Sequence, residues 1–139
     1  MIEELSRKIF IEISLKERDI REYTPLALAY LGDAVYELFI RTLVLSEGNA
    51  PVHKLHKLST EYVKAKAQSG IIHRIFESLT PEEQDIVRRG RNAKPGTVPK
   101  NADIVEYKYA TGFESLLGYL YLKQDYTRMM QILKMCIQE

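Results

Sequence analysis

Apolar residues recur at helical spacing along the chain, and no stretch alternates between apolar and polar positions as a half-buried strand would. Residues 1–20 place Ile2, Leu5, Ile9 and Ile13 on one side of a predicted helix. The pattern therefore favours an all-α protein.

A second predicted helix spans residues 25–45. It opens with Thr24, which can cap a helix N-terminus, and Pro25, which suits the first helical turn. Apolar residues occur on almost every side of this segment, which is typical of the central helix of a bundle. We therefore expect this helix to be the most buried one.

The middle of the chain predicts two further helices and a long loop. Residues 51–69 carry one apolar stripe, and residues 71–76 continue it after a glycine. Thr80 to Glu83 has the sequence of a capping box and starts a helix of about ten residues. Residues 90–101 contain two glycines and two prolines, so we expect a loop there. Loops of that length are usually functional or mobile.

The last part of the chain contains the clearest helical pattern. Five residues follow the spacing of one helix face without a miss: Phe113, Leu116, Leu117, Leu120 and Tyr121. Asp125 is expected to cap a final helix that turns five residues inward: Tyr126, Met129, Met130, Leu133 and Ile137. We expect one domain over residues 1–139, a bundle of about six to seven helices. Residues 1–23 would form an N-terminal helix and linker, and residues 90–102 a mobile basic loop.

Composition narrows the class of protein. A chain of 139 residues has the size of one domain, and 45% hydrophobic with 28% charged residues argues against disorder. No uncharged apolar run approaches the roughly 18 residues of a membrane span, and the N-terminus lacks a secretory pattern. The single cysteine, Cys136, fits a reducing compartment. We expect a small cytoplasmic domain without a membrane partner.

The positive charge is concentrated in one short segment. The net charge is only +1, but residues 88–102 hold five basic residues and no acidic one. The rest of the chain then carries 15 basic against 19 acidic residues. This asymmetry would orient a polyanion toward residues 88–102, although such charge runs are as often solvated mobile loops.

Three acidic residues interrupt apolar helical segments. Asp33 lies in the middle of the second predicted helix, Glu37 follows one turn later, and Glu114 lies in the apolar segment near the C-terminus. Because a buried unpaired carboxylate costs several kcal/mol, each must find a cation, a hydrogen-bond cluster or an open cavity. A structural carboxylate satisfied by tyrosine or arginine is the alternative to a metal site.

Glycines accompany these acids. Gly32 precedes Asp33, while Gly112 and Gly118 flank Glu114. Since a glycine inside a helix costs about 0.5–1 kcal/mol relative to alanine, we expect the close approach of another helix, a metal or a phosphate. Two carboxylates from different helices could hold Mg²⁺, which takes oxygen ligands and keeps several waters.

Two segments resemble motifs of the ribonuclease III family. Leu31-Gly32-Asp33-Ala34-Val35 resembles its signature helix, and the segment from Phe113 to Leu122 resembles its second acidic motif. Three motifs in order, Leu28 to Ala34, Arg89 to Lys94 and Pro99 to Asn101, resemble the Mini-III branch more closely, and the resemblance covers about residues 24–138. The resemblance implies a helical endonuclease domain of the ribonuclease III kind.

The chain departs from the larger family at two acidic positions. Where that family has a second acid four residues before the signature aspartate, this chain has Ala29. Where it has an aspartate three residues before the second-motif glutamate, this chain has Thr111. The Mini-III branch tolerates both changes, which leaves the number of metal ions open. Glu37 and Thr111 are weaker candidates, for an indirect role at the site or a dimer contact.

The resemblance implies hydrolysis of double-stranded RNA with Mg²⁺, or Mn²⁺ as an alternative, held by Asp33 and Glu114. Five residues would bind RNA: Arg91, Asn92, Lys94, Thr97 and Lys100. It further implies a homodimer that matures precursors of large-subunit ribosomal RNA, and a ribosomal protein is a further candidate partner. A catalytically silent RNA-binding or ribosome-associated protein, and a helical protein-interaction module, are the alternatives.

Overall fold

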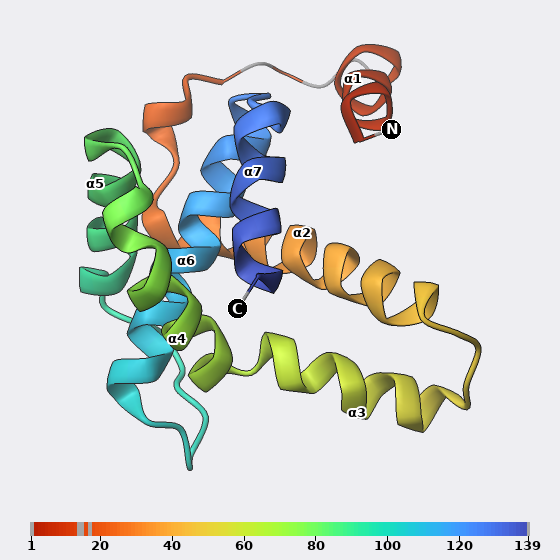
Figure 1. Cartoon of the computed structure of the whole chain (residues 1–139). Coiled ribbons are helices and arrows are strands. Elements are labelled where there is room, and N and C mark those ends of the chain that lie inside the picture. The colour runs from red at the N-terminus through yellow and green to blue at the C-terminus, as the bar shows by residue number, and fades with distance from the viewer. Residues whose placement is uncertain (1, 14–15, 17, 139) are drawn as a thin grey trace.

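The computed structural model describes residues 2–13, 16 and 18–138 (Figure 1). Within them the chain forms helices and no strand, which confirms the all-α prediction. The helices are α1 (Ile2–Glu12), α2 (Pro25–Ser46), α3 (Val52–Val63), α4 (Ala65–Ile75), α5 (Pro81–Asn92), α6 (Ile104–Leu122) and α7 (Tyr126–Ile137), with short 3-10 turns η1 (Ile20–Glu22) and η2 (Phe76–Ser78). In this described part no helix is long and apolar enough to cross a membrane.

Helix α6, rather than α2, is the centre of the bundle. It packs against α2, α4, α5 and α7, which surround it in Figure 1. Nearly every residue of its second half is buried, from Ala110 to Leu120 with the exception of Glu114. The expectation that residues 25–45 form the most buried helix is wrong. Helix α2 turns one side to α6 and leaves Tyr30 85% and Leu38 55% exposed on the other.

Glycines allow the backbones of α2 and α6 to touch. A Cβ on Gly32 would overlap the carbonyl oxygen of Glu114 and lie 2.8 Å from the nitrogen of Gly118. A Cβ on Gly118 would overlap the carbonyl oxygen of Leu28. Gly112 serves the same purpose against α5, because its Cβ would lie 2.5 Å from the carbonyl oxygen of Val87. This confirms the expectation that another helix approaches closely.

Helix boundaries differ from the sequence pattern in three places. The N-terminal helix ends at Glu12 instead of residue 20, with Leu5 and Ile13 exposed. The stripe over residues 51–69 is broken at Lys64, whose ψ of 151° ends α3 and starts α4. Helix α5 continues through Asn92, so the loop before α6 starts at Ala93 rather than at residue 90. Apolar periodicity continued across the first two boundaries, and a glycine suggested the third too early.

Capping residues were predicted correctly at three helices. Thr24 accepts a hydrogen bond from the nitrogen of Ala27, and Asp125 accepts one from that of Arg128. At α5, both bonds of the capping box are present between Thr80 and Glu83. In α7, three of the five residues expected to face inward are buried: Tyr126, Met129 and Leu133. Met130 and Ile137 are exposed and lie toward the outer side of the helix.

Candidate active site

Asp33 and Glu114, which lie far apart in the sequence, meet at the crossing of α2 and α6. Gly32 stands against the carbonyl of Glu114, so the residue after it, Asp33, is brought beside the Glu114 side chain. Asp33 lies close enough to raise the pKa of the Glu114 carboxyl. Asp33 is exposed and Glu114 is half-buried, so the expectation that both acids are buried holds only in part. The pair therefore opens to solvent on the α2 side.

The surroundings of Glu114 disfavour its charged form. Burial raises the pKa of this carboxyl to about 8, with further contributions from Asp33 and Glu37. A hydrogen bond from Gln68 acts in the opposite direction and does not compensate. No arginine or lysine within the described ranges forms an ion pair with Asp33 or Glu114. The alternative of a structural carboxylate neutralised by a basic residue therefore does not apply to this pair.

Gln68 on α4 is a third polar neighbour that the sequence analysis missed. Its side-chain nitrogen donates to the carbonyl oxygen of Val63 over 2.8 Å and to Oε2 of Glu114 over 3.4 Å. The residue is only 2% exposed. Helical spacing from Ile71, Ile72 and Ile75 places position 68 on the buried stripe. A polar residue on that stripe was the sequence signal that could have identified Gln68.

Two buried oxygen atoms near this pair have no hydrogen-bond partner in the described structure. They are Oε1 of Gln68 and Oε2 of Glu37. The other oxygen of Glu37 lies 3.5 Å from the guanidinium of Arg41, in an exposed pair on α2. Unpartnered buried acceptors are costly unless a donor or a cation occupies the space beside them.

This donor set fits a hydrated divalent cation. It consists of two adjacent carboxylates and two unpartnered oxygen acceptors, which are the ligand types that Mg²⁺ prefers. No group of three or more His, Cys, Asp or Glu side chains that could hold a metal occurs among residues 2–13, 16 and 18–138. A bound ion would therefore rely on Asp33 and Glu114 and retain waters, for which Gln68 and Glu37 supply acceptors.

Thr111 lies one turn before Glu114 on α6. It is buried, and its hydroxyl donates to the carbonyl oxygen of Tyr107 over 2.9 Å. The hydroxyl thus has its hydrogen-bond acceptor within the same helix. At this position, where the larger family has an aspartate, this chain has a small side chain without a carboxylate.

The five RNA-binding candidates lie at the end of α5 and in the loop that follows it. Nε of Arg91 donates to the side chain of Asn92 over 3.1 Å, so these two residues form one unit at the helix end. Lys94, Thr97 and Lys100 are exposed on the loop. The hydroxyl of Tyr107 donates to the carbonyl oxygen of Thr97 over 3.4 Å, which ties the loop to α6.

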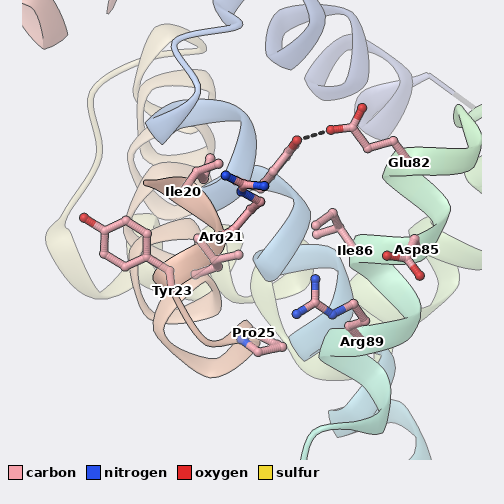
Figure 2. Close-up of a pocket in the computed structure, with 10 residues that line it drawn as sticks. Ile20, Arg21, Tyr23, Pro25, Glu82, Asp85, Ile86 and Arg89 are labelled. Atoms are coloured by element: carbon pink, nitrogen blue, oxygen red, sulfur yellow. Dashed lines mark hydrogen bonds between the residues drawn. The ribbon is translucent and has the colours of Figure 1, made fainter. Parts of the chain in front are cut away.

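A separate cavity lies on the other side of α6 and contains neither acid (Figure 2). Its volume is about 290 Å³, and it is enclosed by η1, the start of α2, α5 and Tyr119. The hydroxyl of Tyr119 donates to Glu82, whose carboxylate also lies 3.6 Å from Lys123. Two arginines (Arg21 and Arg89) and two acids (Glu82 and Asp85) line it, so their charges balance.

Comparison with known proteins defines the class of this fold and site. Residues 26–125 match the model of the ribonuclease III domain. A crystal structure of a Fusobacterium nucleatum protein superposes with a TM-score of 0.79 at 36% identity, covering 88% of this chain and all of that one. The chain therefore belongs to the ribonuclease III family.

Its relatives place it in one branch of that family. It is 50% identical over 124 residues to the Mini-ribonuclease 3 of Thermoanaerobacter, covering 89% of this chain and 87% of that protein. It is 46% identical over 132 residues to the Mini-ribonuclease 3 of Clostridium tetani, covering 94% and 87%. The resemblance inferred from three motifs is confirmed, and the protein is an endoribonuclease. The silent RNA-binding alternative and the interaction-module alternative are thereby set aside.

Proposed function

We propose that this endoribonuclease hydrolyses double-stranded or structured RNA with Mg²⁺ held by Asp33 and Glu114. The observation that carries the proposal is the meeting of these two carboxyl groups beside two unpartnered buried oxygens, without an ion pair from any arginine or lysine in the described part of the chain to either carboxyl group. Mn²⁺, which accepts the same oxygen ligands, can substitute. A bound divalent cation polarises a phosphate oxygen and supplies a water of lowered pKa.

The side chains of the site have distinct tasks in this proposal. Glu114, half-buried and hydrogen-bonded to Gln68, is the fixed ligand. Asp33, exposed at the same point, is the ligand on the solvent side and orients the attacking water. Glu37 and Gln68 accept hydrogen bonds from waters of the ion and so keep their own buried oxygens satisfied.

The RNA is proposed to bind across the acid pair and the basic end of α5. Arg91, Lys94 and Lys100 would contact phosphates, and Asn92 and Thr97 would add hydrogen bonds. Duplex RNA is recognised mainly by shape, phosphates and 2′-hydroxyls, which suits side chains presented on a helix end and loop. We propose residues 1–139 as one catalytic domain, with 1–23 as N-terminal helix and linker and with the end of α5 and the loop at residues 93–103 as the basic element that contacts RNA.

We further propose a homodimer that works on ribosomal RNA precursors in the cytoplasm. The outer side of α2 exposes Tyr30, Leu38 and Leu45, an apolar side suited to a second copy. Precursors of large-subunit ribosomal RNA are the proposed substrate, because the family resemblance implies them. A ribosomal protein bound to that RNA is the proposed accessory partner.

The test compares two aspartate variants on a defined RNA duplex. Asp33→Asn removes one charge from the acid pair and is expected to lower the cleavage rate by at least about 10²-fold. Asp85→Asn removes the same charge from the other cavity and is the matched control, with an expected change of less than about twofold. Cleavage is followed on gels over a titration of Mg²⁺ and, separately, Mn²⁺, and circular dichroism confirms that both variants are folded. Equal rates for the two variants would contradict the proposal.

A further inference from the structure

A second hollow of about 280 Å³ lies between α4, η2, α5 and α6, outside the acid pair. Its lining contains two arginines, a histidine, two aromatic rings, one glutamate and one buried isoleucine: Arg88, Arg91, His73, Phe76, Tyr109, Glu77 and Ile72. In size it is similar to the cavity of Figure 2, and it lies near the lower end of the roughly 300–1,000 Å³ of ligand sites. Unlike that cavity, however, this hollow has two arginines and only one glutamate in its lining.

The two guanidinium groups of this hollow are held on aromatic rings. The guanidinium carbon of Arg88 lies 5.3 Å from the ring centre of Phe76, and that of Arg91 lies 5.5 Å from the ring centre of Tyr109. A cation over the face of a ring is attracted by it, and a guanidinium in this position keeps N–H donors for other partners. The other side chain packed on Tyr109 is His73, at 4.2 Å between ring centres.

No carboxylate in the described ranges forms an ion pair with either arginine. Arg88 makes no hydrogen bond there, and Arg91 donates only to Asn92, through Nε. Nδ1 of His73 lies 2.7 Å from the carbonyl oxygen of Ser69 and must donate to it, so Nε2 is the ring nitrogen that remains available. Glu77 is the one acid in the lining, against two arginines. The lining of the hollow therefore carries excess positive charge.

The hollow is close to the acid pair along two helices that contact each other. Gln68 meets Glu114, and five residues further along α4 His73 meets Tyr109, which lies five residues before Glu114 on α6. Five residues of an α-helix span about 7.5 Å along its axis. Arg91 also leads directly into the basic loop.

We propose that this hollow binds a phosphate of the RNA substrate outside the scissile one, with Arg88 as its main contact and Arg91 and His73 beside it. The inference rests on the proposed function, because it assigns a further substrate contact to the same enzyme. Two stacked guanidiniums match the tetrahedral oxygens of a phosphate, and the hollow is large enough to hold that group with its sugar.

The chain supplies a matched pair of residues for the test. Arg88 and Arg89 are consecutive, exposed and on the same helix, but Arg88 lines this hollow and Arg89 lines the cavity of Figure 2. Binding of a fluorescent RNA duplex is measured by anisotropy in EDTA, so that no cleavage occurs, from 50 to 200 mM salt. Arg88→Ala is expected to weaken binding about tenfold and to reduce the salt slope by about one phosphate contact. Arg89→Ala is expected to change binding less than twofold.

Two further arms separate the possible outcomes. Arg88→Lys keeps the charge and loses the planar fork, so it should retain the salt slope and lose part of the affinity. Titration of the wild-type protein with inorganic phosphate and with adenosine monophosphate, followed by the NMR signals of His73, tests for a site that takes only free anions. If His73 responds to these anions but Arg88→Ala and Arg89→Ala bind RNA equally well, the assignment to RNA is wrong. If the wild-type protein binds no duplex, the proposed function itself fails.

Discussion

Glu83, which is buried, and Glu114, which is half-buried, have opposite electrostatic surroundings. Glu83, near the start of α5, accepts two hydrogen bonds of 2.8 Å from the guanidinium of Arg128 and completes the capping box with Thr80. These contacts hold its pKa below the usual range. Glu114 on α6 faces other carboxyl groups and a glutamine, and its pKa is raised to about 8.

The difference separates a carboxylate that stabilises the fold from one that is kept for a ligand. At Glu83 every strong acceptor has a donor within the protein. At Glu114 the neighbouring oxygens of Glu37 and Gln68 lack one. A protein tolerates such a deficit where binding later supplies the missing partner, so functional sites are commonly less stable than their surroundings.

Gly32→Ala is expected to destroy the crossing on which the acid pair depends. Its Cβ would overlap the backbone of α6, which cannot move without displacing the core, so we expect a loss of more than about 4 kcal/mol of unfolding free energy. Chemical denaturation measures this. Gly70→Ala in α4 is the control, because nothing lies within 4 Å of its added Cβ, and it should be neutral or stabilise by up to about 1 kcal/mol. A stable Gly32→Ala protein would show that the two helices separate easily.

Arg128→Met is expected to destabilise the protein by about 3 kcal/mol, because it leaves Glu83 buried without its partner. The side chains of this pair are 23% and 7% exposed. Arg21→Met breaks the ion pair with Asp19, which is shorter, at 2.6 Å, but has 87% and 43% exposed side chains. This control should leave the unfolding free energy nearly unchanged, because exposed ion pairs contribute little to stability. Equal losses would mean that burial does not determine the contribution of Glu83.

Glu114→Gln should have the opposite sign and stabilise the metal-free protein by on the order of 2 kcal/mol at pH 8. The sign follows from the raised pKa: the folded carboxyl contributes stability below its unfolded pKa of about 4.3, and this is lost as the pH rises toward 8. The gain should therefore vanish near pH 4. Thermal melts in EDTA at the two pH values measure it. A destabilised variant at pH 8 would make Glu114 a structural residue.

The smallest effect is expected at Glu83. The loss of folding stability at acid pH should depend in part on this carboxylate. Because its folded pKa is lowered, its contribution is present above the unfolded pKa and is lost as the pH falls through the folded value. Glu83→Gln should remove this part of the pH dependence at acid pH. Melting temperatures of the two proteins should therefore converge as the pH is lowered. Parallel curves would assign the loss of stability at acid pH to other carboxyl groups.

The sequence predicted the elements in which local signals agree. The five apolar positions on α6, the capping box at α5 and the N-cap Asp125 of α7 follow from spacing and side-chain chemistry alone. The two acids were recognised because carboxylates rarely occur inside apolar helices. The break at Lys64 was missed, since the apolar stripe continues on both sides of it. This break leaves the carbonyl of Val63 free for Gln68, and so positions the neighbour of Glu114.

The predicted loop boundary at residue 90 affected how the basic residues were interpreted. With a loop beginning at residue 90, Arg91 belongs to a mobile basic segment. Because α5 extends through Asn92, Arg91 is instead fixed on the helix, where it lines the same hollow as Arg88. The partners of Arg88 and Arg91 come from α4, η2 and α6. Only tertiary structure brings those rings into reach, so no local pattern could have identified the hollow.

The contact at Gly32 and Gly118 is made by main-chain atoms, and this has a practical consequence for altering the enzyme. The path of the main chain therefore determines the distance between the two acids, and most side-chain substitutions elsewhere do not change it. Outer positions of α3, which carry none of the proposed metal or RNA contacts, can thus be randomised in search of new cutting preferences. Libraries built in this way should retain turnover in most members, because the mutated positions do not support the catalytic spacing.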